Sequence, residues 1–103
     1  MNSIYSDGLG RQLYYASDGV DVNKVTWLLE EGAPVNWRNS GGWTPLHRAC
    51  LNNNPGCVKV LLQHGADVMA RNVYAKTPLH MACWSGSIDC VKLLMATGQC
   101  DLG

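Results

Sequence analysis

The sequence lacks phenylalanine, any long apolar run and any cluster of charge of one sign. Eight Lys and Arg residues balance eight Asp and Glu residues, so the formal net charge is zero. A surface that follows nucleic-acid phosphates needs clustered Lys and Arg, and the charge balance therefore argues against a nucleic-acid partner. No run approaches the roughly 20 apolar residues of a membrane-spanning helix, so no membrane association is expected.

The beginning of the chain also lacks the marks of a secretory signal. Its first ten residues, MNSIYSDGLG, have neither a basic start nor an apolar core. The five cysteines are odd in number and include no CxxC spacing, which does not fit the disulfide framework of a small secreted domain. We expect an intracellular protein, in the cytoplasm or nucleus, with reduced thiols. Residues 1–9 are expected to form a loose lead-in that partly covers the first helix pair.

What the sequence does contain is a repeat with a period of 33 residues. Trp43–Cys50 reads WTPLHRAC, and Lys76–Cys83 reads KTPLHMAC. One period earlier the same box falls on Arg11–Ala16, where only Leu13 and Ala16 are kept. The chain is three copies of one unit, which is about the minimum that buries a stable core. The period also relates Gly32, Gly65 and Gly98.

The two TPLHxAC boxes, with a GAPVN before the first and a GADV between them in the same register, resemble the ankyrin repeat family. The resemblance covers about residues 9–103. It implies an all-α solenoid, in which each unit is a helix, a tight turn, an antiparallel helix and a hairpin-like finger. The repeats are expected at about 10–38, 39–71 and 72–103, within one domain spanning 10–103. A protein partner is implied, and its identity is not.

The boxes also carry local helix signals. Thr44 and Thr77 are suited to cap helices that begin with a proline, whose missing N–H is harmless in the first turn. The resemblance implies that His47 hydrogen-bonds locally and to the neighbouring finger. Tyr14 takes this place in the first repeat, so the histidine linkage is expected to be missing there. Val22, Val25, Leu28 and Leu29 form the apolar stripe of an outer helix.

The cysteines and histidines are interpreted as structural. Cys50 and Cys83 are one period apart, as are Cys57 and Cys90, and all four are expected on buried helix faces as core residues. Zinc ligands lie about 2.0–2.3 Å from the metal, whereas equivalent points on packed helices lie about 8–10 Å apart. The His-x-x-Cys pairs of the two boxes therefore do not favour a shared metal site.

No arrangement of residues supports catalysis or a cofactor. Glu30 and Glu31 are adjacent on a helix and do not face each other, so they indicate a charged surface and not an acid/base pair. Gly41–Gly42 is not followed by the Lys-Ser/Thr of a phosphate-binding loop. We expect a protein that is not an enzyme.

Four tryptophans stand out in a chain without phenylalanine. Trp27 is expected in the core, because Val60 and Leu93 occupy its position in the other repeats. Trp43 lies at the base of a finger, where it either contacts a partner or packs across the neighbouring finger. Trp84 ends an inner helix, where it either contacts a partner or covers the helix end.

The resemblance implies that fingers and inner helices line a concave face that recognises partners. Trp, Tyr and Arg are the residue types enriched among binding hot spots, and several fall on this face. Its basic residues would favour an acidic or phosphorylated peptide. The candidate protein-binding residues are Arg38, Ser40, Gly41, Trp43, Arg48, Leu51, Arg71, Val73, Tyr74, Lys76 and Trp84.

Two functions remain open at this point. The first is a non-catalytic protein-interaction module, an adaptor or scaffold that binds through finger tips and concave face. The second is an architectural or oligomerisation segment of a longer array, with a weaker likeness to substrate-receptor adaptors. A terminal repeat needs a polar outer face, and the third repeat keeps an unmodified TPLH box and several apolar residues. The apolar residues of this repeat are Ile88, Val91, Leu94 and Met95. A further repeat, a partner or a second copy of the chain by self-association would bury them, and a natural three-repeat protein with a poor cap is the other alternative.

Overall fold

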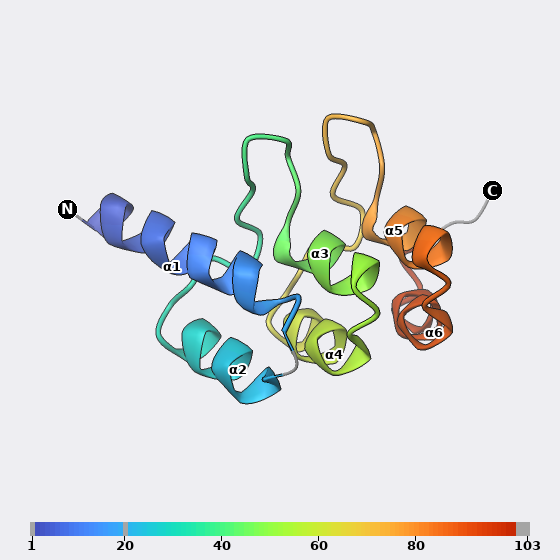
Figure 1. Cartoon of the computed structure of the whole chain (residues 1–103), viewed down its shortest axis with the longest axis horizontal. Helices are drawn as coiled ribbons and strands as arrows, with labels where there is room; N and C mark the ends of the chain where they lie inside the picture. Colours follow the sequence, from blue (N-terminus) through green and yellow to red (C-terminus); the bar gives the residue numbers. More distant parts are fainter. Residues whose placement is uncertain (1, 20, 101–103) are drawn as a thin grey trace.

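Three pairs of α-helices stand side by side in the computed structural model, which describes residues 2–19 and 21–100, with side chains from residue 8 onward. Six helices and no strand occur in these ranges, which confirms the predicted all-α repeat fold (Figure 1). The helices are α1 (Asn2–Ala16), α2 (Val22–Glu30), α3 (Pro45–Leu51), α4 (Pro55–Gln63), α5 (Pro78–Ser85) and α6 (Ile88–Ala96).

The helices form two rows. Figure 1 shows α1, α3 and α5 in an inner row and α2, α4 and α6 in an outer row. Two long connections rise beyond the inner row: the first finger (residues 31–44) between α2 and α3, and the second finger (residues 64–77) between α4 and α5. The molecule is elongated, with extents of 43 × 27 × 21 Å.

The beginning of the chain differs from the expected loose lead-in. Helix α1 starts at Asn2 and spans 15 residues, against 7 in α3. Leu9 lies one helical turn before Leu13, and both side chains are buried in the core. The apolar face of the first inner helix therefore extends one turn further back than the repeat register indicates.

Threonine caps begin α3 and α5 as predicted. The backbone N–H of His47 donates to Thr44 Oγ1 (3.3 Å), and Nδ1 of His47 accepts the Thr44 N–H (3.1 Å). Thr77 and His80 repeat this reciprocal arrangement, at 3.4 and 3.0 Å. Such capping boxes satisfy N–H groups that a helix start leaves without intrahelical partners.

Asn54 fixes the turn between α3 and α4. Its Oδ1 accepts the N–H of Cys57 (3.4 Å) at the start of α4. Its Nδ2 donates to the carbonyl oxygens of Ser17 (3.2 Å) and Gly19 (2.6 Å) in the first repeat. One side chain therefore caps a helix and joins two repeats, and the turn includes Asn53 in the left-handed region at φ 54°.

The core lies between the two rows. Its most deeply buried side chains recur with the repeat period, and each is 0–1% exposed: Leu13, Val25, Leu28, Leu46, Val58, Leu61 and Leu94. The predicted stripe on α2 is confirmed for Val25, Leu28 and Leu29.

The placement of Trp27 in the core was wrong, because 54% of this residue is exposed on α2. Its counterparts Val60 and Leu93 are themselves only half-buried. The position lies at the edge of the apolar face, so the larger indole extends into solvent.

His47 joins the second repeat to the third. Its Nε2 lies 2.8 Å from the carbonyl oxygen of Lys76 in the second finger. A carbonyl only accepts and the Thr44 N–H only donates, so Nε2 carries the proton and Nδ1 is unprotonated. The linkage expected to be missing in the first repeat exists in another form, because the hydroxyl of Tyr14 accepts a hydrogen bond from Asn39 Nδ2 (3.2 Å).

This environment keeps His47 neutral. Burial lowers its pKa below the ordinary value of 6.5, and Nδ1 faces the Thr44 N–H, which opposes a second proton on the ring. The unfolded chain therefore binds a proton more readily than the folded one. The stabilisation due to the neutral ring is complete above pH 6.5 and is lost as the pH falls through the lowered pKa.

We expect the free energy of unfolding, measured by urea denaturation, to be lower at about pH 5.5 than at about pH 7.5. His47→Gln should lower stability at both pH values and reduce the difference between them. The control His64→Gln alters an exposed side chain and should keep the wild-type pH dependence. An unchanged pH dependence in His47→Gln would contradict the assignment.

Candidate protein-binding surface

One asparagine side chain fixes the backbone turn at the tip of each finger. In the first finger, Asn39 Oδ1 accepts the N–H groups of Gly41 and Trp43, both at 2.9 Å. In the second finger, Asn72 Oδ1 does the same for Tyr74 (2.9 Å) and Lys76 (3.1 Å). The repeat register contains this pair, 33 residues apart, but we did not identify its role from the sequence.

The two fingers are also tied to each other. The N–H of Val73 donates to the carbonyl of Gly41 (3.0 Å). Arg38 Nη1 donates to the carbonyl of Arg71 (2.7 Å) and to that of Gly42 (3.2 Å). At Gly42 the backbone has φ +77°, and a Cβ there would lie 3.1 Å from the Cα of Asn72. Glycine therefore permits the close approach, and the fingers present a fixed surface.

Most of the predicted binding residues reach solvent. On the fingers, Arg38, Ser40, Arg71, Val73, Tyr74 and Lys76 are exposed, as is Trp84 on α5. Half-buried are Gly41, Trp43, Arg48 and Leu51. The largest exposed apolar surfaces among them belong to Trp84 (81%), Tyr74 (70%) and Val73 (67%).

Trp43 belongs to the framework of the first finger. Its ring centroid lies 5.7 Å from that of His47 in a tilted arrangement, and the side chain packs against the core. Its backbone N–H is held by Asn39. Trp43 therefore packs against His47 of its own repeat and against the core.

Arg48 joins the first and second repeats. Its guanidinium lies 4.8 Å from the ring centroid of Tyr14 and 5.1 Å from that of Tyr15, and it forms an ion pair with Asp18. Leu51, one turn further along α3, is half-buried against the core. Both residues lie on the inner row, and Arg48 contributes chiefly to contacts between repeats.

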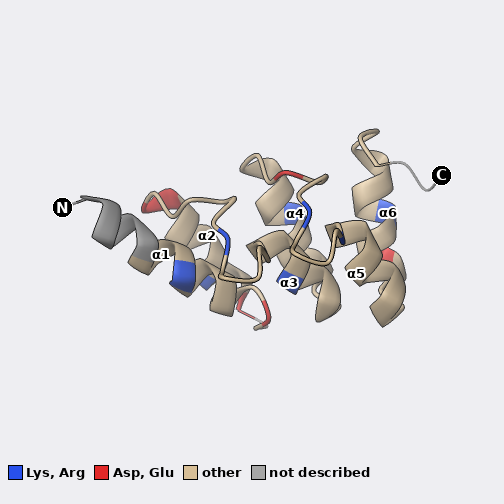
Figure 2. Ribbon diagram, turned by 90° about the horizontal axis from the view of Figure 1, so that it is seen from above, with Lys and Arg blue, Asp and Glu red and all other residues tan. Residues whose placement is uncertain are grey.

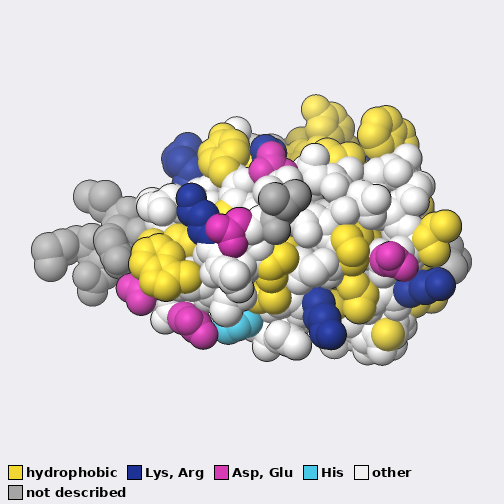
Figure 3. Space-filling model, turned by 60° about the horizontal axis from the view of Figure 1, so that its bottom comes forward, with side chains coloured by type: hydrophobic (Ala, Val, Ile, Leu, Met, Phe, Trp, Pro, Cys, Tyr) yellow, Lys and Arg dark blue, Asp and Glu magenta, His cyan; other side chains and the backbone are white. Residues whose placement is uncertain are grey.

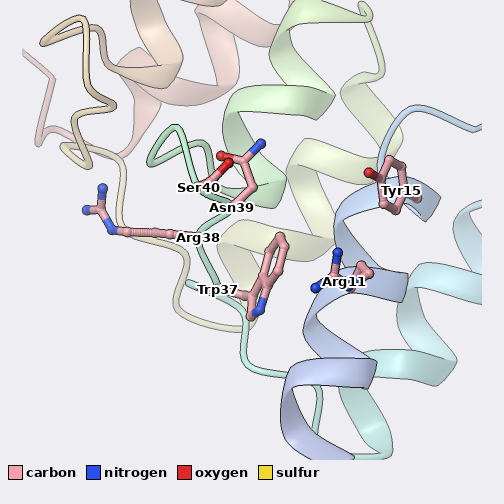
Figure 4. Close-up of a pocket in the computed structure, with 6 residues that line it drawn as sticks. All are labelled: Arg11, Tyr15, Trp37, Arg38, Asn39 and Ser40. Carbon is pink, nitrogen blue, oxygen red and sulfur yellow. The ribbon is translucent and has the colours of Figure 1, made fainter. Parts of the chain in front are cut away.

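The structure adds a pocket that sequence reasoning missed. It lies between α1 and the first finger and has a volume of about 440 Å³ (Figure 4). The available signals were two departures from the repeat: Trp37 where the next unit has Ala70, and Arg11 where it has Thr44. The lining residues are Arg11, Tyr15, Trp37, Arg38, Asn39 and Ser40.

The cysteines divide into two environments. Cys50, Cys57 and Cys90 are fully buried as predicted, and burial raises the pKa of Cys57 to about 11. The neighbouring Cys90 thiol and burial raise the pKa of Cys50. Cys83 is exposed, so its predicted burial was wrong.

The difference between Cys50 and Cys83 has a simple cause. The Cys50 carbonyl accepts hydrogen bonds from the hydroxyls of Ser85 (3.0 Å) and Ser87 (3.2 Å), which belong to the next repeat. In the described part of the chain, no further repeat lies against Cys83. Burial at this position of the box therefore depends on the neighbouring unit.

Charged groups are dispersed over the molecule. Lys and Arg occur in all three repeats (Figure 2), and on the outer-row face they alternate with acidic and hydrophobic side chains (Figure 3). Glu30 and Glu31 are exposed at the end of α2. Among the described residues, no group of three or more His, Cys, Asp and Glu could hold a metal ion, and no helix is long and apolar enough to cross a membrane.

A solenoid of helix pairs with paired fingers defines the class of protein. Residues 13–102 match the family described as ankyrin repeats, in three copies, so the chain belongs to the ankyrin repeat family. It is also 47% identical over 49 residues to a protein of Bos taurus named mitochondrial disaggregase. This match covers 48% of the chain and 7% of that relative, so the chain spans a small fraction of the relative's length.

We expect the native thiols to react at very different rates. Cys83 should be alkylated by iodoacetamide first, because the buried thiols of Cys50, Cys57 and Cys90 become accessible only when the structure opens. Peptide mass spectrometry after timed quenching measures each site, and the urea-unfolded protein is the control in which the rates converge. Equal labelling of Cys50 and Cys83 in the native protein would contradict the described burial.

Proposed function

We propose that this protein is a non-catalytic interaction module that binds a partner protein through its finger tips and inner-helix face. Ankyrin repeats are generally protein–protein interaction modules. The observation that carries the proposal is the exposure of Val73 and Tyr74 on the second finger and of Trp84 on α5. Large aromatic side chains contribute much of the energy at binding interfaces when a partner removes them from water.

The rigidity of the fingers supports this proposal. Arg38 and Val73 hold the two fingers together through backbone carbonyls, and Asn72 fixes the backbone on both sides of Ala75. A surface that is already ordered loses little conformational entropy when it binds. The dispersed charge also favours a protein partner over a nucleic acid.

Two variants separate binding from folding. Peptides selected from a display library against the wild-type protein provide ligands whose affinity is measured by fluorescence polarisation. We expect Tyr74→Ala combined with Trp84→Ala to weaken binding by about tenfold or more, since hot-spot truncations cost roughly 2 kcal/mol or more. Stability should change little, because both side chains are exposed.

Trp27→Ala is the matched control, because it removes an exposed indole from the outer row. It should leave the affinity of the selected peptides unchanged. Equal affinities of the wild type and the double variant, or an equal loss in Trp27→Ala, would contradict binding through fingers and inner helices.

The exposed end of the third repeat favours a second candidate function, in which this repeat associates with a further helix pair. His47 is fully buried, with the Lys76 carbonyl on its Nε2. Its counterpart His80 is exposed, and its Nε2 forms no hydrogen bond among the described residues. Ile88 (67%) and Met95 (37%) add exposed apolar surface on α6. A second copy of the chain would supply such a helix pair.

Light scattering at increasing protein concentration tests this self-association. We expect the wild type to exceed the monomer mass and Ile88→Glu combined with Met95→Glu to remain monomeric, because charges oppose burial of this surface. Trp27→Glu, on the opposite part of the molecule, is the control and should associate like the wild type. A wild type that stays monomeric throughout would contradict self-association.

A further inference from the structure

The pocket between α1 and the first finger depends on Gly10. A Cβ on Gly10 would lie 2.3 Å from Cδ1 of Trp37, so only glycine admits the indole against α1. The Trp37 ring also lies 5.7 Å from the ring of Tyr14. Ala70 takes the place of Trp37 in the next repeat, and its methyl group cannot form such a wall. The pocket is therefore particular to the junction of the first and second repeats.

One wall of this pocket is fixed by its own hydrogen bonds. Asn39 Nδ2 donates to the Tyr14 hydroxyl, and Asn39 Oδ1 accepts the backbone N–H groups of Gly41 and Trp43. The guanidinium of Arg38 is directed away from Trp37, toward the second finger, where it donates to the carbonyl of Arg71 (Figure 4). Asn39 therefore has most of its hydrogen-bonding capacity in use within the protein, and Nη1 of Arg38 is engaged by two backbone carbonyls.

The remaining lining side chains offer donors. The Arg11 guanidinium lies 5.8 Å from the ring centroid of Trp37. Among the described residues, no side-chain hydrogen bond or ion pair involves Arg11, the Tyr15 hydroxyl, the Ser40 hydroxyl or the Trp37 indole N–H. No Asp or Glu is among the six lining residues. A pocket with a cation and three further donors is suited to an anion.

The second finger junction has different residues at these positions. Thr44 and Ala70 stand at the positions of Arg11 and Trp37, and Val73 stands at the position of Ser40. Arg48 stands at the position of Tyr15, and its guanidinium is already paired with Asp18. Thr44 is already used as a helix cap. The combination of Arg11, Tyr15, Trp37 and Ser40 is therefore particular to the first junction. Arg11 and Tyr15 belong to the copy of the box that departs most from TPLHxAC.

We propose that this pocket binds the anionic group of a partner peptide, a carboxylate or a phosphate, through Arg11 with Tyr15, Ser40 and Trp37. The inference rests on the proposed function, because it names the chemistry of a partner that the fingers bind. A guanidinium near an aromatic ring presents its edge to paired oxygens, a geometry that suits both carboxylate and phosphate. The indole and phenol rings accept the apolar part of the same side chain.

Nuclear magnetic resonance of the ¹⁵N-labelled protein provides a direct test. The probes are N-acetyl-phosphotyrosine amide, O-phosphoserine, N-acetyl-glutamate and, as the uncharged control, N-acetyl-tyrosine amide. The indole resonance of Trp37 is assigned by its absence in Trp37→Phe. We expect saturable shifts of this resonance and of the Arg11 Nε–H with at least one anionic probe, and none with the uncharged probe. The phosphate and carboxylate arms then identify the group that is preferred.

Arg11→Gln is the decisive variant, because Arg11 is exposed and its loss leaves the core intact. This substitution should lower the affinity for the anionic probe by about tenfold, as expected for loss of a charge-assisted contact. Lys24→Gln removes an exposed cation from α2 and should leave the probe affinity unchanged. The affinity should also fall as salt is added.

Absence of saturable shifts with all three anions, or equal affinity in Arg11→Gln and wild type, would overturn the proposal. The peptides selected against the fingers distinguish this failure from failure of the proposed function. If binding of these peptides still requires Tyr74 and Trp84 but not Arg11, the proposed interaction module is supported and the anion site is contradicted. If they depend on none of these residues, the proposed function fails as well.

Discussion

The arrangement of the second and third repeats depends on the two hydrogen bonds of the buried His47 ring, which join the start of α3 to the second finger. One ring nitrogen holds the start of α3 through Thr44, and the other holds the second finger through the carbonyl of Lys76. Because the ring is buried, an unsatisfied nitrogen would cost roughly 1–3 kcal/mol. The same side chain therefore couples the geometry of a helix to the position of a finger that presents candidate binding residues.

Adjacent repeats bury each other's side chains and satisfy each other's backbone carbonyls. Cys50 is buried because the third repeat covers it, and its carbonyl accepts two serine hydroxyls from that repeat. Cys83, with the same place in the box, is exposed. Asn54 caps its own helix and also binds carbonyls of the first repeat. A structure of this kind is stabilised by contacts between adjacent units, which here share one core that runs through all three repeats.

The junction of the first and second repeats differs in sequence from the second junction, but a side-chain hydrogen bond still joins α1 to the first finger. Tyr14 replaces the histidine, and its hydroxyl still meets the neighbouring finger through Asn39. The longer α1, with Gly10 facing Trp37, then creates a pocket that the second junction lacks. In the sequence, Tyr14 departs from the histidine of the box, and Trp37 departs from Ala70 in the next finger. Their common location became visible only when α1 and the first finger were placed together.

The sequence by itself determined the period, and through the resemblance of the repeated box it indicated the all-α repeat fold. It also determined the threonine caps and the apolar stripe of α2, because these depend on residues close together in the chain. It did not determine the exposure of Trp27 or Cys83, nor the extent of α1. Exposure depends on which unit lies against a side chain, and the same residue type can be buried or free at equivalent positions. Only the tertiary structure decided which departures from the repeat, such as Arg11 and Trp37, share one pocket.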